Sequence, residues 1–144
     1  MKKYIKSSEY ICAMSIINPK YCSNHTIQVE IEQRDERSIP HLHVYHDHTR
    51  NPKKCSYVRL DKVSYSDHHG KPSIELPSNL KQQFVELMNK PWPKHLIELS
   101  DGTIRPATGY EAAVDIWVDT YEQDLSKFHT DEKGNLIQLD YSSL

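Results

Sequence analysis

Two stretches of sequence decide the fold class of this chain: residues Thr26 to Glu32 read TIQVEIE, and residues Pro40 to His48 read PHLHVYHDH. In the first stretch, β-branched apolar residues alternate with polar ones, and this period of two is typical of a strand with one solvated face. The polar link RDERSIP joins the two stretches, so we expect them to pair as a hairpin with a loop longer than two residues. The centre of the sequence therefore predicts antiparallel β-structure.

Further apolar stretches, bounded by turn residues, extend this β-structure in both directions. Asn18-Pro19 closes the first of them, Gly70 lies in a turn near the middle of the chain, and Ser100-Asp101-Gly102 joins a later pair. We expect strands at 10–17, 55–60, 63–65, 74–76, 96–99, 103–105 and 136–141. The connections between many of them are short, which favours an antiparallel meander.

Two stretches change to a helical period. At 80–89 one face is apolar, and Ser78 or Asn79 is expected to cap this helix while Pro91 ends it. That face consists of Leu80, Phe84, Leu87 and Met88. Thr108 and Glu111 form a clearer capping box, which opens a second helix that extends to about residue 122. Its apolar face consists of Tyr110, Ala113, Val114, Trp117 and Tyr121.

The length and the element order together indicate the architecture. A chain of 144 residues suits one domain. We expect a single α+β domain over residues 1–144, with one antiparallel sheet of about five to seven strands packed by two helices.

Composition excludes several classes of protein. The net charge is −2 and 37% of the residues are hydrophobic, which argues against a strongly basic nucleic-acid binder and against disorder. No apolar run approaches the roughly 18 residues of a membrane span, and the start, MKKYIKSSEYICAM, does not resemble a signal peptide. Cys12, Cys22 and Cys55 share no C-x-x-C spacing and are typical of reduced thiols. We therefore expect a cytoplasmic protein with no membrane partner.

The histidine-rich stretch carries the chemistry. On a strand, His41 and His43 point to the same face, about 7 Å apart, and we expect that face to be accessible. Two such histidines can chelate a divalent ion, Zn or Mn/Mg, if a third ligand is present. Asp47 is the predicted third ligand, and His68, His69 or a carboxylate on a neighbouring strand are the other candidates. The alternative is a polar strand face without a cofactor.

Charged residues gather in two places. On one side of the second helix lie the acidic residues Glu111, Asp115, Asp119 and Glu122. Beside the histidine stretch lie the basic residues Arg50, Lys53, Lys54 and Arg59. These two groups are the predicted partner-binding surfaces. A protein is the favoured partner, and nucleic acid is a weaker possibility.

The stretch Pro40-His41-Leu42-His43-Val44 resembles the strand that marks a small bacterial domain family of unknown function. Similar features follow in the same order at Tyr57 to Leu60, at Glu75-Leu76-Pro77 and in the helix at 80–88. The resemblance covers a core of about residues 31–89, and a helical and strand extension over 92–144 lies outside it. The family implies a small cytosolic protein, often encoded on mobile elements or near toxin–antitoxin genes. It implies no established activity.

The same histidines also resemble the His-hydrophobe-His strand of nicking nucleases that initiate replication of small single-stranded DNA viruses and plasmids. That resemblance implies a divalent ion on His41 and His43 and a helical tyrosine, Tyr110 or Tyr121, that attacks a DNA phosphate. The sequence therefore carries two hypotheses. The first is a bacterial or phage-encoded binding or regulatory protein that acts through charged surfaces without catalysis. The alternative is a metal-dependent phosphodiester nuclease.

Overall fold

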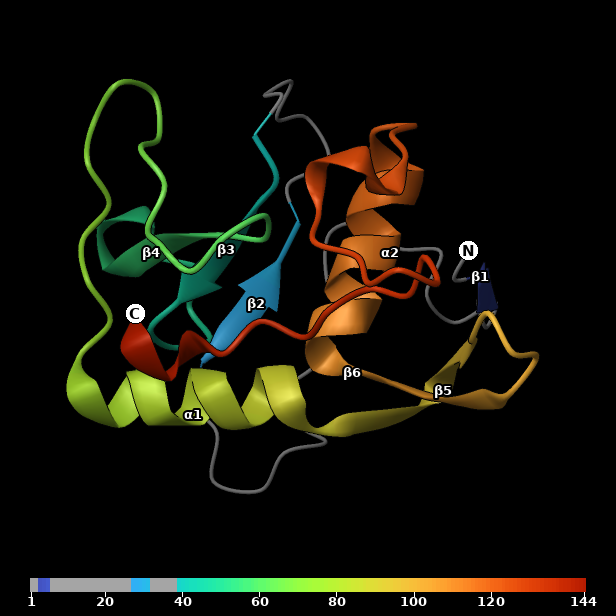
Figure 1. Ribbon diagram of the computed structural model, residues 1–144. Helices are drawn as coiled ribbons and strands as arrows, with labels where there is room; N and C mark the ends of the chain where they lie inside the picture. Colours follow the sequence, from blue (N-terminus) through green and yellow to red (C-terminus); the bar gives the residue numbers. More distant parts are fainter. Residues whose placement is uncertain (1–2, 6–26, 32–38) are drawn as a thin grey trace.

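The computed structural model describes residues 3–5, 27–31 and 39–144 (Figure 1). Two helices and two antiparallel sheets of three strands each make up these residues, so the predicted α+β class is confirmed. The first sheet has the order β2-β3-β4 and consists of β2 (Gln28–Glu30), β3 (His41–Tyr45) and β4 (Cys55–Arg59). The second has the order β1-β5-β6 and consists of β1 (Lys3–Ile5), β5 (Pro91–Glu98) and β6 (Ile104–Thr108). The strand predicted at 10–17 lies outside the described residues.

The prediction of one sheet with five to seven strands is wrong for the described part of the chain. Strand β5 begins at Pro91, directly after α1 (Ser78–Asn89), and leads away from the first sheet (Figure 1). It pairs with β1 and β6 instead of with β2, β3 or β4. The helix therefore separates two small sheets that the strand pattern alone does not distinguish.

Three shorter predictions also fail. The stretch at 63–65 contributes only the isolated bridge between Val58 and Tyr65, and 74–76 forms no strand. The tail has a bridge between Thr130 and Leu136 and then the 3₁₀ turn η5 (Tyr141–Ser143) in place of a strand at 136–141. Side chains hold this tail, because the Tyr141 hydroxyl donates to the carbonyl of Arg59 on β4.

Both helices bury the predicted faces. In α1, Leu80, Phe84, Leu87 and Met88 are all buried. Its N-cap is Pro77, with no side-chain cap, so the predicted cap at Ser78 or Asn79 is wrong. Helix α2 (Gly109–Thr120) begins with the predicted capping box, in which Thr108 Oγ1 accepts from Glu111 N and Glu111 Oε1 accepts from Thr108 N.

The main core lies between the β2-β3-β4 sheet and the two helices. The predicted core side of the central hairpin is confirmed, because Ile27, Val29 and Ile31 are fully buried. The prediction of one solvated face is wrong, because Glu30 on the other face is only 4% exposed. They join apolar side chains of β3, β4, α1 and α2, and η5 covers the same core. The first residue of α2, Gly109, lies directly against the backbone of α1 at Leu87. Within the described residues neither helix is long and apolar enough to cross a membrane.

Candidate metal centre

Three histidines from two segments of the chain converge beside the first sheet. His41 and His43 lie on β3, and His68 lies in the loop between β4 and α1. One ring nitrogen of each lies within 4.8 Å of the corresponding nitrogens of the other two. Around a tetrahedral zinc ion with Zn–N bonds of about 2.0–2.1 Å, such nitrogens lie about 3.4 Å apart. The three nitrogens would each have to move by about 1 Å to share one zinc ion.

The two strand histidines are buried, so the prediction that they share an accessible face is wrong. His41 is 1% exposed and His43 is 5% exposed, whereas His68 is half-buried. The loop between β4 and α1 crosses this face of the sheet (Figure 1), and the His68 ring meets the His43 ring edge-on at 5.0 Å. The Trp117 ring of α2 lies 5.5 Å from the ring of His41. The face of the sheet that carries the two histidines is therefore covered.

The hydrogen bond of His41 identifies the ring nitrogen that donates. Its Nδ1 lies 2.9 Å from the carbonyl oxygen of Ile39. Because a carbonyl only accepts, Nδ1 carries the proton and Nε2 carries the lone pair. Histidines that bind metals commonly donate their second nitrogen in this way, which orients the ring.

A tight turn and an aromatic neighbour position His68. The backbone groups of His68 and Lys71 hydrogen-bond to each other in both directions, at 2.8 and 3.1 Å. Between them, His69 and Gly70 both have positive φ, 50° and 75°, as a type I′ turn requires. The His68 ring stacks flat on Tyr57, with centroids 4.0 Å apart and an interplanar angle of 2°. Tyr57 is the residue of β4 that pairs with His43, so the sheet register brings the histidines together.

The predicted third ligand, Asp47, lies outside this group of histidines. Its carboxylate accepts from the backbone and the hydroxyl of Thr49 and lies 3.9 Å from Lys54 Nζ. These hydrogen bonds lower the pKa of Asp47. Of the alternatives that the sequence left open, His68 belongs to the histidine group that the described residues form, whereas His69 and the carboxylates of neighbouring strands do not.

A hollow of about 440 Å³ adjoins the histidines. It is lined by Pro52, Lys53, Cys55, Tyr57, His68, His69, Lys71, Pro72 and Ile74. His68 belongs both to this lining and to the histidine group. Burial raises the pKa of the Cys55 thiol to about 12, which disfavours its thiolate form at neutral pH.

The predicted acidic surface of α2 is only half present. Glu111 is buried and binds both Nη atoms of Arg105, at 2.8 and 3.0 Å. Asp115 is buried and accepts from His95 Nε2 at 2.7 Å. Because β5 and β6 pack along this side of α2, only Asp119 and Glu122 of the four are exposed.

The basic group is similarly divided. Arg50 pairs with Glu30 at 2.7 Å, and Arg59 binds the carboxylate of Asp61 at 2.7 and 2.6 Å. Lys53 and Lys54 are exposed. Arg50 is also exposed despite its ion pair, and Lys54 lies 3.9 Å from Asp47, so Arg59 is the member of this group that is not exposed.

The two tyrosines proposed as nucleophiles differ in their burial. Tyr110 is fully buried, its hydroxyl donates to the carbonyl of Leu60 at 2.7 Å, and burial raises its pKa. Tyr121 is half-buried, and its ring packs at 4.1 Å on Trp117, which also contacts His41. Tyr110 therefore does not offer the exposed phenol that attack on DNA requires.

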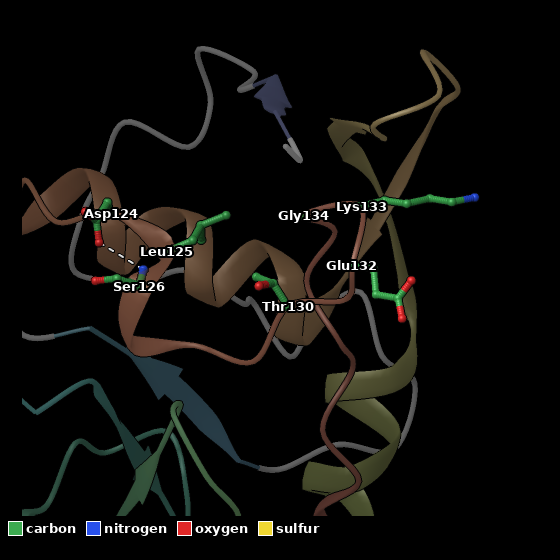
Figure 2. A pocket seen from close by; sticks show the side chains of 7 residues that line it. All are labelled: Asp124, Leu125, Ser126, Thr130, Glu132, Lys133 and Gly134. Carbon is green, nitrogen blue, oxygen red and sulfur yellow. Dashed lines mark hydrogen bonds between the residues drawn. The ribbon is translucent and has the colours of Figure 1, made fainter.

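A second hollow, of about 480 Å³, lies between the 3₁₀ turn η4 (Leu125–Lys127) and the turn before Leu136 (Figure 2). Of its two acidic residues, Asp124 and Glu132, Asp124 accepts from the backbone of Ser126, and Lys133 points outward. The histidine group is the one potential metal cluster that the described residues form, so it is the stronger candidate site.

Comparisons with known proteins give no further guide. No protein-family model, no curated protein and no solved structure matches this chain. The function is therefore argued from the site itself.

Proposed function

We propose that this protein binds a divalent transition-metal ion, zinc in the first place, through His41, His43 and His68. The observation that supports this proposal is the convergence of three imidazoles within 4.8 Å, two of them buried. Neutral imidazole is the commonest metal ligand in proteins. Three histidines are also the ligand set of zinc sites that keep a fourth position for water or a substrate.

The donor type favours zinc among the ions expected from the sequence. Imidazole suits zinc, copper, iron and nickel, whereas magnesium and manganese prefer carboxylate, carbonyl and water oxygens. The histidine group includes no carboxylate. The hydrogen bond from His41 to the Ile39 carbonyl supplies the outer contact that such a ligand needs.

Binding of a macromolecular partner without catalysis is a second candidate function. It is supported by the exposed charges that remain of the two predicted surfaces: Lys53 and Lys54 near the hollow, and Asp119 and Glu122 at the end of α2. A bacterial or phage-encoded, cytoplasmic regulator, as the resemblance of residues 31–89 implies, stays a prediction. The nicking reaction gains no support from Tyr110, which is buried and hydrogen-bonded.

The test is zinc binding by the purified, tag-free chain, measured by competition with a chromophoric chelator. His68→Ala removes a ligand, and His69→Asn is the matched control in the adjacent position, because asparagine tolerates positive φ. We expect about one zinc ion per chain, a loss of affinity of more than about 100-fold in His68→Ala and none in His69→Asn. Circular dichroism checks that both variants are folded.

Two results would overturn the proposal. One is a wild-type chain that binds no stoichiometric zinc, copper or nickel. The other is a folded His68→Ala variant with wild-type affinity, because any zinc would then be held elsewhere.

A further inference from the structure

The hollow beside His68 has the chemistry of an anion site with an apolar floor. We propose that it binds a small organic phosphate ester, with a phosphate oxygen at the fourth coordination position of the metal. This inference rests on the proposed metal function and adds the ligand class to it.

The charge of the lining selects an anion. Lys53 and Lys71 contribute two ammonium groups and His69 a further imidazole, while no Asp or Glu lines the hollow. A phosphate group carries up to two negative charges near neutral pH, and lysine is a common phosphate ligand. A bound metal ion beside His68 adds positive charge to the same place.

The turn fixes one of these lysines relative to the metal ligands. The backbone of Lys71 is paired with that of His68 by two hydrogen bonds. In an antiparallel pair, residues directly opposite each other lie about 4.5–5.5 Å apart. One ligand can therefore contact the metal and the Lys71 ammonium group at once.

The remaining lining indicates an organic ester rather than free phosphate. Pro52, Pro72, Ile74 and the ring of Tyr57 give the hollow an apolar part. Ile74 is one of the exposed large hydrophobic residues of the described chain, with 47% of its surface accessible. A volume of about 440 Å³ lies in the range of pockets for small organic molecules and far exceeds a phosphate ion.

The burial of the histidines gives the direction of approach. His41 and His43 are almost fully covered, whereas His68 is half-buried and lines the hollow. A ligand that reaches the metal by way of the described surface therefore passes through the hollow. Three imidazoles occupy three tetrahedral positions, and the phosphate oxygen takes the fourth.

The test is calorimetric titration of the zinc-loaded protein with phenyl phosphate, inorganic phosphate and a single-stranded oligonucleotide. Lys53→Gln and Lys71→Gln remove the two lining charges, and Lys54→Gln is the matched control next to Lys53. We expect phenyl phosphate to bind at one site and more tightly than inorganic phosphate. Each lining variant should weaken it by about tenfold or more, with no change in the control.

Zinc content, measured after each titration, separates the two proposals. If zinc is retained but phenyl phosphate does not bind, or binds equally well to the lining variants, the phosphate site is refuted and the metal centre stands. If inorganic phosphate binds as tightly as phenyl phosphate, the proposal that the ligand is an organic ester is refuted. Tighter binding of the oligonucleotide refutes the small-molecule ligand in favour of a nucleic-acid surface. If the protein does not load zinc before the titration, the metal proposal is refuted, and the phosphate proposal that rests on it is refuted as well.

Discussion

Replacement of Gly109 by alanine tests the packing that joins the two helices. A Cβ atom at this position would lie 2.1 Å from the carbonyl oxygen of Leu87, 3.0 Å from its carbonyl carbon and 3.2 Å from Cα of Met88. All three are backbone atoms of α1, so no rotamer change makes room. The helices must separate by about 1 Å, and closely packed interiors resist such a shift.

The two energetic effects of this substitution have opposite signs. Alanine is favoured over glycine inside a helix by about 0.5–1 kcal/mol, while overpacking costs about 1–3 kcal/mol and occasionally more. Because the obstacle is backbone, we expect the upper end of that range and a net loss of about 2 kcal/mol. For a domain of this size the loss corresponds to a fall in Tm of roughly 6–10 °C.

Urea unfolding followed by circular dichroism measures this loss. Gly102→Ala is the control, because its Cβ would meet open space and only the φ of +88° opposes it. A Gly109→Ala variant as stable as the wild type, or more stable, would refute the close contact between α2 and α1.

Three further predictions concern individual side chains. Burial raises the pKa of Cys55 to about 12, so iodoacetamide at pH 8 should alkylate this thiol roughly 1,000-fold more slowly in the folded chain than in the unfolded chain. Peptide mass spectrometry measures the two rates, and equal rates would contradict the burial of Cys55. Desolvation lowers the pKa of His46, and Asp47 opposes this with a smaller effect. The imidazole therefore binds a proton more readily in the unfolded chain, and the stability of the fold should decrease as the pH drops below 6.5. His46→Gln should lose that part of the pH dependence, and an unchanged profile would contradict the assignment. Glu111→Ala should lower the free energy of unfolding in urea by about 2–3 kcal/mol, because it removes a helix cap and the charge-assisted hydrogen bonds to Arg105. If Glu111 lay on a solvated helix face instead, the loss would be only a few tenths of a kcal/mol.

Local patterns predicted the helices well. The apolar spacing at 80–89 identified the buried face of α1, and the capping box at Thr108 and Glu111 marked the start of α2. The alternation at Ile27, Val29 and Ile31 likewise identified the core side of β2. These features depend on neighbours within one or two turns of the chain, so the sequence contains them directly.

The site depended on contacts that the sequence does not display. Strand periodicity placed His41 and His43 on one face, but it could not show that the loop at 60–77 and the ring of Trp117 cover that face. The signal for His68 was the dipeptide His69-Gly70, because two successive residues with positive φ form a turn that fixes its neighbours. A tight turn predicted at this dipeptide would have favoured His68 over Asp47 as the third member of the histidine group.

The acidic surface could have been corrected from the sequence in part. Glu111 was both the capping-box residue and a member of the predicted acidic face, and a side chain that bonds to the helix N-terminus is not a free surface charge. Asp115 carried no comparable signal, because its partner His95 lies twenty residues away on β5.

The central claim is that three imidazoles hold one metal ion, and X-ray absorption spectroscopy of the zinc-loaded protein tests it most directly. We predict a first shell of nitrogen at about 2.0–2.1 Å, with the outer-shell pattern of about three imidazole rings. A shell that contains sulfur at about 2.3 Å, or oxygen without imidazole, would place the zinc on other residues and contradict the assignment of His41, His43 and His68.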